Sequence, residues 1–152
     1  MTASTDGLAR VLEPVTVAGV RLRNRVFVSA HTTNFGEGFA PTSRHLAYLT
    51  ERARGGAGLI IVEPLRVHDT TLGRAGGLGA SAVSEPMLTR IAEAIRDEGA
   101  AAFVQITHAG RHSENAFTRT AAWGPGAMPY HRTAHVPHAM TISDMKEIRR
   151  AY

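Results

Sequence analysis

The sequence predicts a parallel α/β fold, and three observations support this prediction. Three short apolar runs rich in β-branched or aromatic residues lie at residues 25–30, 58–63 and 101–107. A segment with helical periodicity separates each run from the next, so the order is strand, helix, strand, helix, strand. The runs do not alternate between apolar and polar residues, which is typical of strands covered on both faces. A doubly wound sheet and a (β/α)8 barrel both fit, although a barrel needs about 250 residues and eight such units, and this chain of 152 residues holds three.

A small hairpin is expected before the first strand. The segments PVTVAG and VRLRN resemble two short strands on either side of Ala18 and Gly19. Such a hairpin can close one mouth of a barrel. An N-terminal hairpin that closes no barrel explains the pattern equally well.

The first helix is expected over residues 43–54. Leu46, Leu49 and Ala53 recur there at spacings of three and four residues, and the pair Gly55-Gly56 is placed to end the helix. These spacings put the three apolar side chains on one helical face.

The second helix has clearer boundaries. Ser84 can cap it, Pro86 fits its first turn, and Gly99 follows as a stop. Its apolar face consists of Leu88, Ile91, Ala92 and Ile95.

The last quarter of the chain combines a long loop with a final helix. Residues 108–140 are rich in glycine and proline and are too long for a plain connection, so we expect a functional loop over one end of the sheet. Thr141 and Asp144 occupy the first and fourth positions of a capping box, which predicts a helix starting there.

Composition excludes several classes of protein. The net charge of +4 and the pI near 10.3 come from arginines scattered singly, without the basic stripe of a nucleic-acid-binding surface. The absence of cysteine excludes disulfides and thiolate metal sites. The sequence shows neither a basic leader followed by an apolar run nor the roughly 20 apolar residues needed to cross a membrane. We therefore expect a cytoplasmic protein with no nucleic-acid or membrane partner.

Polar side chains follow the predicted strands, where ligands bind in parallel α/β folds. A hydroxyl, an amide and an imidazole that converge there can form hydrogen bonds with the polar edge of a flat heterocycle. The residues at these strand ends are Ser29, Ala30, His31, Thr32, Glu63, Pro64, Gln105, Thr107 and His108.

Several other features have simpler structural interpretations. His108 and Arg111 are expected to anchor their loop, and Glu63 is expected to be an ion-pair anchor. Trp123 and Tyr130 are expected to pack within the long loop.

Two apparent ligand motifs are also weak. The spacing of His131, His135 and His138 suggests a metal site, but a loop surface is favoured because no carboxylate or thiolate accompanies them. Gly77 and Gly79 fit a dinucleotide-binding motif poorly, because Gly77 comes 14 residues after Glu63 and not directly after the strand.

Five ordered segments resemble the N-terminal signatures of the old yellow enzyme family. They are RLRNRVFVSAHTTNFGEG, ERARGGAGLIIVEP, VQITHAGRHS, WGPGAMP and TISDMKEI, and together they extend the similarity from Leu12 to Tyr152. The similarity is greatest to the branch that includes 2,4-dienoyl-CoA reductase and other NADH:flavin oxidoreductases. The resemblance implies that residues 1–152 are the N-terminal portion of a single FMN-binding (β/α)8 barrel domain, an incomplete TIM barrel of three strand-helix units.

The resemblance also implies a function. It predicts an FMN-dependent oxidoreductase that uses NADH or NADPH to reduce activated C=C bonds of a small-molecule enone or enoyl-type substrate. Assembly as a homo-oligomer is compatible with this prediction. The family's catalytic residues lie on later strands, so no catalytic residue is assigned here, and an iron–sulfur cluster would belong to a region beyond this chain. The alternative is a non-catalytic fragment that acts, if at all, through association. A phosphate-binding aldolase barrel is disfavoured because no predicted strand ends in a lysine.

The resemblance assigns five residues to the flavin. Ala30, His31 and Thr32 match the segment that contacts the ring, with Thr32 near its reactive part. Pro64 matches a second contact, and Gln105 matches the amide that pairs with the pyrimidine edge. His31 replaces an apolar residue found in many relatives, Ala30 replaces proline or serine, and Pro64 removes a backbone N–H that glycine or alanine would offer.

Overall fold

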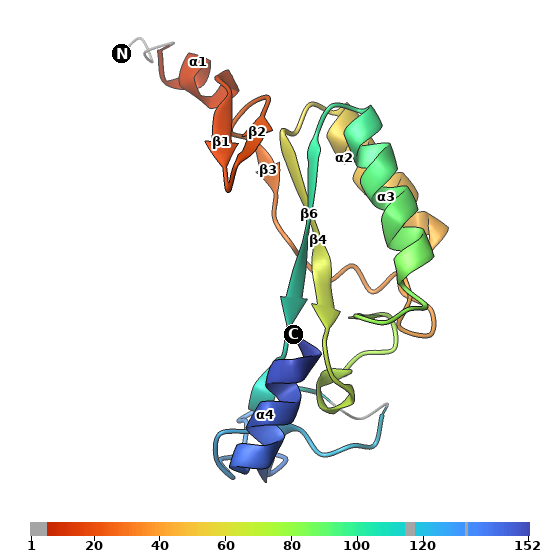
Figure 1. Ribbon diagram of the computed structural model, residues 1–152, viewed down its shortest axis with the longest axis vertical. Helices are drawn as coiled ribbons and strands as arrows, with labels where there is room; N and C mark the ends of the chain where they lie inside the picture. The colour runs from red at the N-terminus through yellow and green to blue at the C-terminus, as the bar shows by residue number, and fades with distance from the viewer. Residues whose placement is uncertain (1–5, 115–117, 133) are drawn as a thin grey trace.

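The computed structural model describes residues 6–114, 118–132 and 134–152. Figure 1 shows a narrow sheet with two long helices on one face, a hairpin at one end, and loops with a final helix at the other end. The parallel strand-helix units predicted from the sequence are confirmed.

The sheet is built around its longest strand, β4 (Leu59–Arg66). Strand β3 (Phe27–Val28) pairs with the start of β4, and β6 (Ala101–Thr107) pairs along its other edge; both pairings are parallel. A short strand, β5 (Leu78–Gly79), pairs in parallel with the far end of β4. The three predicted strands are therefore neighbours in the order β3, β4, β6, with their carboxyl ends at the same edge.

The bounds of two strands differ from the prediction. The first strand is limited to two residues, whereas the second continues beyond Glu63 to Arg66. Pro64 therefore lies inside β4 and not after it, which corrects the sequence-based expectation. The pairing register with β6 shifts between Val62 and Leu65, because proline has no N–H to donate to the ladder and is accommodated at such irregularities.

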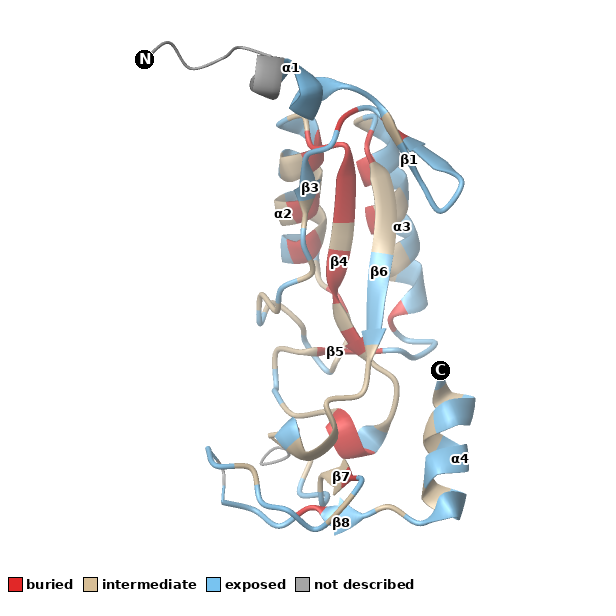
Figure 2. Ribbon diagram, turned by 90° about the vertical axis from the view of Figure 1, so that its left-hand side faces the viewer, coloured by how far each residue is buried: buried red, intermediate tan, exposed pale blue. Residues whose placement is uncertain are grey.

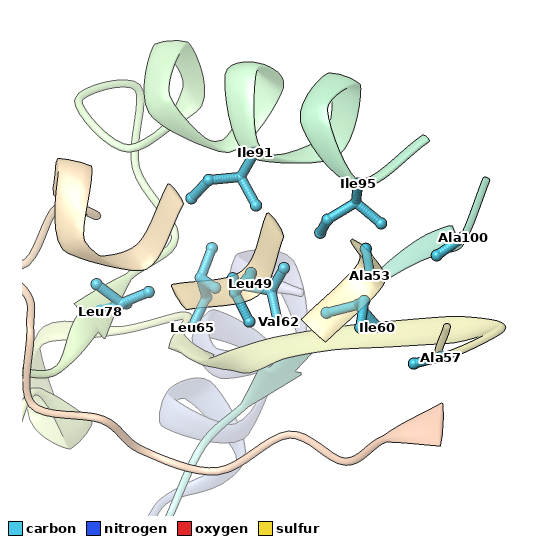
Figure 3. Packing of buried hydrophobic residues seen from close by; sticks show 10 residues of the cluster. All are labelled: Leu49, Ala53, Ala57, Ile60, Val62, Leu65, Leu78, Ile91, Ile95 and Ala100. Atoms are coloured by element: carbon cyan, nitrogen blue, oxygen red, sulfur yellow. The ribbon is translucent and has the colours of Figure 1, made fainter. Parts of the chain in front are cut away.

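The two central helices pack on the same face of the sheet. Helix α2 (Ser43–Arg54) has the predicted bounds, and α3 (Glu85–Asp97) runs beside it. Figure 3 shows their buried side chains meeting those of β4. The hydrophobic cluster is formed by Leu49, Ala53, Ala57, Ile60, Val62, Leu65, Leu78, Ile91, Ile95 and Ala100.

One helix start was predicted wrongly in detail. Ser84 precedes α3, but its hydroxyl makes no capping bond and donates instead to the carbonyl oxygen of Gly79 at 2.7 Å. Ser84 is fully buried, so this bond ties the start of α3 to β5. Gly99 ends the helix with a φ of +76°, as its position after the apolar face predicted.

The N-terminal hairpin is confirmed. Strands β1 (Val15–Val17) and β2 (Val20–Leu22) are antiparallel, and both Ala18 and Gly19 have positive φ, as the tight turn between them requires. Helix α1 (Asp6–Leu12), which the sequence reading did not predict, precedes the hairpin. An apolar hollow separates the hairpin from the start of the sheet, lined by Val15, Val17, Leu22, Arg25, Val26, Phe27, Leu59 and Ile61.

Arg23 joins the hairpin to the ends of both central helices. Its guanidinium donates to the carbonyl oxygens of Ala53, Ala57 and Glu98 at 2.6, 2.9 and 2.8 Å. The adjacent Asn24 side chain donates to the carbonyl of Gly56 at 2.8 Å. These bonds tie the hairpin to carbonyl groups in and just after the last turn of α2 and at the end of α3.

The other end of the sheet carries short elements and the last helix. The loop contains the 3₁₀ turns η1 (Asp69–Thr71) and η2 (Gly110–His112) and the paired strands β7 (Trp123–Gly124) and β8 (His138–Ala139). Helix α4 (Ile142–Ala151) begins with the predicted capping box: Asp144 N–H donates to the Thr141 hydroxyl, and Thr141 N–H donates to the Asp144 carboxylate. Within the described parts of the chain, no helix has the length and apolarity to cross a membrane.

Burial is uneven across the sheet. In Figure 2, β4 is mostly buried, whereas the second half of β6 is exposed. Val104 and Ile106 retain 47% and 44% of their accessible surface, because among the described strands β6 pairs only with β4. Phe27 is 58% exposed on the opposite edge strand.

Candidate functional site

The candidate site lies at the carboxyl ends of the three neighbouring strands. Thr32 follows β3 and lines a small cavity together with Pro64 of β4. Gln105 of β6 lies between Val104, which pairs with Val62, and Ile106, which pairs with Leu65. Gln105 is therefore beside the irregular part of β4 that contains Pro64.

The register places Gln105 on the sheet face opposite the helices. Ile61 pairs with Phe103 and lines the hollow under the hairpin, whereas Ile60 belongs to the core that α2 and α3 cover. Because strand side chains alternate between faces, Gln105 lies on the same face as Phe103. The polar side chain thus faces away from the helical layer.

Arg66 is a site residue that the sequence reading did not single out. It lines the same cavity as Thr32 and Pro64, and its guanidinium has no hydrogen bond or ion pair within the described parts of the chain. Burial lowers the pKa of its guanidinium, the like charge of Arg74 lowers it further, and Glu63 opposes the shift. A charged residue directly after the apolar run and Glu63-Pro64 was the signal that could have revealed it.

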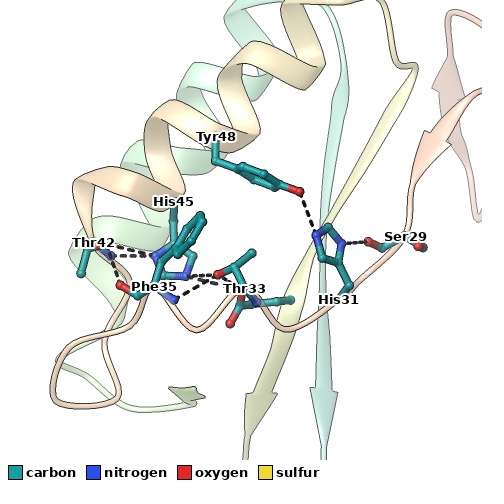
Figure 4. Close-up of polar contacts among 8 residues, drawn as sticks. Ser29, His31, Thr33, Phe35, Thr42, His45 and Tyr48 are labelled. Carbon is teal, nitrogen blue, oxygen red and sulfur yellow. Dashed lines mark hydrogen bonds and ion pairs between the residues drawn. The ribbon is translucent and has the colours of Figure 1, made fainter. Parts of the chain in front are cut away.

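His31 is turned toward helix α2, as Figure 4 shows. Its Nδ1 lies 3.1 Å from the Ser29 carbonyl oxygen and its Nε2 lies 2.8 Å from the Tyr48 hydroxyl. The carbonyl can only accept, so Nδ1 carries the proton, and in the neutral ring Nε2 accepts from Tyr48. Ala30, just before it, is half-buried.

Thr33 is bonded to Glu63. Its backbone N–H donates to Glu63 Oε2 at 2.8 Å, and its hydroxyl donates to the same oxygen at 2.5 Å. His45 Nε2 lies 3.2 Å from the Thr33 hydroxyl oxygen and 3.5 Å from Glu63 Oε2. The Thr42 N–H donates to His45 Nδ1 at 3.0 Å, which leaves the proton of the neutral ring on Nε2, directed toward Thr33 and Glu63.

Glu63 is a buried anion with one free oxygen. Its side chain is 3% exposed and that of His45 is 1% exposed. Burial raises the pKa of the Glu63 carboxyl, but hydrogen bonds from His45 and Thr33 outweigh burial, and the net effect lowers the pKa. Glu63 therefore anchors the loop after β3 through hydrogen bonds from Thr33 and a contact with His45, and the expected ion pair stays a prediction; Oε1 is buried with no hydrogen-bond partner among the described residues.

The strand order and the helical layer on one face agree with comparisons to known proteins. A sequence model of the NADH:flavin oxidoreductase / NADH oxidase family matches residues 10–152. The chain belongs to this family. Its curated relatives include a metal reductase of Desulforamulus reducens, 29% identical over 140 residues, with 91% of this chain and 21% of that protein covered.

Solved structures of family members show the same fold. A complex of 2-naphthoyl-CoA reductase with 2-naphthoyl-CoA matches 93% of this chain and 24% of its own, with a TM-score of 0.86 and 26% identity. The old yellow enzyme homologue of Zymomonas mobilis matches 93% of this chain and 42% of its own, with a TM-score of 0.83 and 21% identity. The chain spans about a fifth of the length of the curated relatives it matches.

The remaining polar residues of this family member support the loops. His108 Nδ1 accepts from the Gly110 N–H at 3.0 Å, and its Nε2 lies 3.0 Å from the Thr70 hydroxyl, so its expected anchoring role is confirmed. Burial lowers the pKa of His108, and the nearby charges of His68 and Arg66 lower it further.

The aromatic residues of the long loop pack as expected. Trp123 lies between His68 and His138, with ring centroids 5.3 and 5.4 Å away, and Tyr130 stacks on His112 at 4.4 Å. His138 pairs with Asp144 at 2.9 Å. Over the described ranges, no group of three or more potential ligands is arranged to hold a metal ion.

The glycines of the loop between β4 and β5 allow close packing of the backbone. The Gly36 N–H donates to the carbonyl of Gly76 at 2.9 Å, and a Cβ added at Gly76 would lie 2.5 Å from the carbonyl oxygen of Asn34. Glycine is needed here because the loop after β4 packs backbone against backbone on the loop after β3.

Proposed function

We propose that this protein is an FMN-dependent oxidoreductase that reduces activated C=C bonds with NADH or NADPH. One observation carries the proposal: Thr32, Pro64 and Gln105 lie near the carboxyl ends of three neighbouring parallel strands, and Thr32 and Pro64 line one cavity there. Neither the Thr32 hydroxyl nor the Gln105 side-chain amide has a hydrogen-bond partner in the described parts of the chain, so both groups are available to a ligand.

These side chains suit the edge of a flavin. The amide of Gln105 offers a donor and an acceptor together, which the pyrimidine edge of the ring requires. The Thr32 hydroxyl donates near the reactive part of the ring and stabilises charge there. Pro64 contributes a rigid contact without an N–H, and Ala30 and His31 complete the segment beside it. Bound FMN supplies the hydride chemistry, and the protein supplies orientation and electrostatics.

Flavin binding is tested with the purified protein. We expect a flavin absorption spectrum after titration with FMN, and an increase of about tenfold in the Kd for FMN in Gln105→Ala, since a pair of hydrogen bonds is lost. Thr89→Val is the matched surface control, because the Thr89 hydroxyl bonds only to Glu85 within α3. Unchanged flavin affinity in Gln105→Ala would remove this residue from the site.

The substrate is a small enone or enoyl-type molecule in this proposal. One structural relative is a complex of 2-naphthoyl-CoA reductase with 2-naphthoyl-CoA. The reductase branch that includes 2,4-dienoyl-CoA reductase and assembly as a homo-oligomer both stay predictions. Anaerobic stopped-flow reduction by NADH and by NADPH identifies the preferred reductant.

A non-catalytic role through association is the alternative. The exposed apolar residues Phe27, Val104 and Ile106 favour it, since an uncovered strand edge promotes association. In that case the purified protein is colourless after incubation with FMN and forms aggregates on size-exclusion chromatography. A monodisperse yellow protein contradicts this alternative.

A further inference from the structure

We propose that two side-chain clamps, one on each side of Thr32, hold this residue in position for the flavin. The first clamp joins His31 to Tyr48, and the second joins Thr33 to Glu63 and His45. This inference rests on the proposed flavin site and adds Tyr48, Thr33, Glu63 and His45 as residues that position it.

The Tyr48 clamp fixes the residue before Thr32. The Tyr48 hydroxyl bonds His31 at 2.8 Å, and the His31 ring is held from its other nitrogen by the Ser29 carbonyl. The Arg52 guanidinium lies 3.1 Å from the centroid of the Tyr48 ring and restricts its movement. The imidazole therefore has one orientation, with both nitrogens bonded.

The Glu63 clamp fixes the residue after Thr32. Thr33 is held through its backbone N–H, so the bond to Glu63 constrains the main chain and not only a side chain. The N–H of Thr42, the ring of His45 and the hydroxyl of Thr33 form a continuous series of bonds ending at Glu63. Glu63 and His45 are almost completely buried, so water does not compete for these bonds.

Both clamps end on the same helix. His45 and Tyr48 are three residues apart on α2 and therefore lie on neighbouring positions of one helical face. Figure 4 shows both side chains directed toward the loop after β3. Thr32, between the clamped residues, lines the cavity shared with Pro64 and Arg66 instead.

The arrangement has a functional consequence. A loop that is already ordered loses less conformational entropy when a ligand binds, so the clamps increase affinity without contacting the ligand. A fixed Thr32 hydroxyl also donates at a constant distance to the ring, and such a bond stabilises reduced flavin. Loosening either clamp is therefore expected to weaken FMN binding and lower the flavin midpoint potential.

Three variants that each remove one group test the inference. Tyr48→Phe removes the hydroxyl of the first clamp, and Thr33→Val removes the hydroxyl of the second clamp while keeping the backbone N–H. Thr50→Val is the matched control, because Thr50 lies on α2 and its hydroxyl bonds only to the Leu46 carbonyl at 2.7 Å. The Kd for FMN is measured by fluorescence titration and the midpoint potential by dye-linked reduction.

We expect Tyr48→Phe and Thr33→Val each to raise the Kd for FMN about 3- to 10-fold and to lower the midpoint potential. The double variant is expected to exceed either single variant in both measurements, and Thr50→Val is expected to match the wild type within about twofold. Unchanged affinity and potential in both clamp variants would overturn the inference, as would equal shifts in Thr50→Val.

A measurement without flavin separates failure of the clamps from failure of the flavin site. In the flavin-free protein, the amide proton of Thr33 is expected far downfield and protected from exchange, and Glu63→Gln is expected to remove both properties. A protected amide in a wild-type protein that binds no FMN overturns the flavin site and, with it, the role of the clamps toward flavin. An unprotected amide in a wild-type protein that binds FMN overturns the clamps alone.

Discussion

Thr33 donates both its backbone N–H and its hydroxyl to a single carboxylate oxygen of Glu63, 30 positions further along the chain. This pair connects the loop after β3 to the interior of β4. It thereby links the segments that carry Thr32 and Pro64, two of the residues that we propose to contact the flavin. The charge of Glu63 is what makes these bonds strong, because hydrogen bonds to an ionised acceptor are shorter and stronger than neutral ones.

The stability of the protein is expected to depend on the ionisation of Glu63. Its pKa in the folded protein is lower than its ordinary value of 4.5, so the unfolded chain takes up a proton first as the pH falls. The stabilisation is therefore complete above about pH 4.5 and is lost as the pH falls through the folded pKa. Urea unfolding between pH 7 and pH 3 should show a steeper loss of stability in the wild type than in Glu63→Gln.

Glu63→Gln is also expected to cost about 1–3 kcal/mol in free energy of unfolding at pH 7, because buried bonds to a charged group are replaced by weaker ones. Parallel pH profiles for the variant and the wild type would show that Glu63 does not ionise differently in the folded protein.

Two arginines are expected to differ in their effect on stability. Arg23→Met removes bonds to three carbonyl groups at the ends of α2 and α3, and we expect a loss of about 2 kcal/mol or more. Arg66→Met removes a half-buried cation that has no bonding partner in the described parts of the chain, and we expect a change within about 0.5 kcal/mol or a gain in stability.

Chemical denaturation of the flavin-free protein measures the free energy of unfolding of both variants and of the wild type. A loss of stability in Arg66→Met as large as that in Arg23→Met would show that Arg66 has a structural partner.

Ile95 is expected to be a large contributor to the core. It is fully buried between α3 and the sheet, so Ile95→Ala should reduce the free energy of unfolding by about 2–5 kcal/mol. Ile142→Ala is the matched control, because Ile142 is 67% exposed on α4 and its loss should change stability little. The two denaturation midpoints provide the comparison, and equal midpoints would contradict the packing described for α3.

The capping box of α4 is expected to stabilise that helix alone. Thr141→Ala removes the acceptor for the Asp144 N–H and should cost about 1 kcal/mol, seen as faster amide exchange in residues 142–151 and not in α3. Ser143→Ala, in the same first turn, is the control. Uniform acceleration across both helices would indicate global destabilisation instead of loss of the cap.

The elements with local signals were predictable from the sequence. Helix α2 has the predicted bounds because its apolar spacing and the following Gly-Gly pair are contained in one short segment. The capping box at Thr141 and Asp144 and the turn at Ala18 and Gly19 are likewise contained in a few residues. For the same reason, the apolar runs predicted three parallel strands, but the expectation that all three are buried holds only for β4, since β3 and the second half of β6 are exposed.

Features that depend on distant residues were not predictable in the same way. The end of β4 was placed too early, because only pairing with β5 and β6 carries the strand past Pro64 to Arg66. Ser84 was expected to cap α3, but its hydroxyl donates a hydrogen bond to the carbonyl of Gly79, which the fold brings next to it. The partner of Glu63 was left open because His45 lies 18 positions earlier, on a helix that only packing places beside β4.

By itself, the sequence determined the order and type of the strands and central helices and the family to which the chain belongs, since apolar periodicity, turn residues and contiguous motifs act within short stretches of chain. The tertiary structure decided which polar groups meet: Thr33 with Glu63 and His45, and His31 with Tyr48. It also decided that Thr32, Pro64 and Arg66 line one cavity. The physical reason is that a buried polar group must find its hydrogen-bond partner wherever the folded backbone places one, and sequence separation does not record that distance.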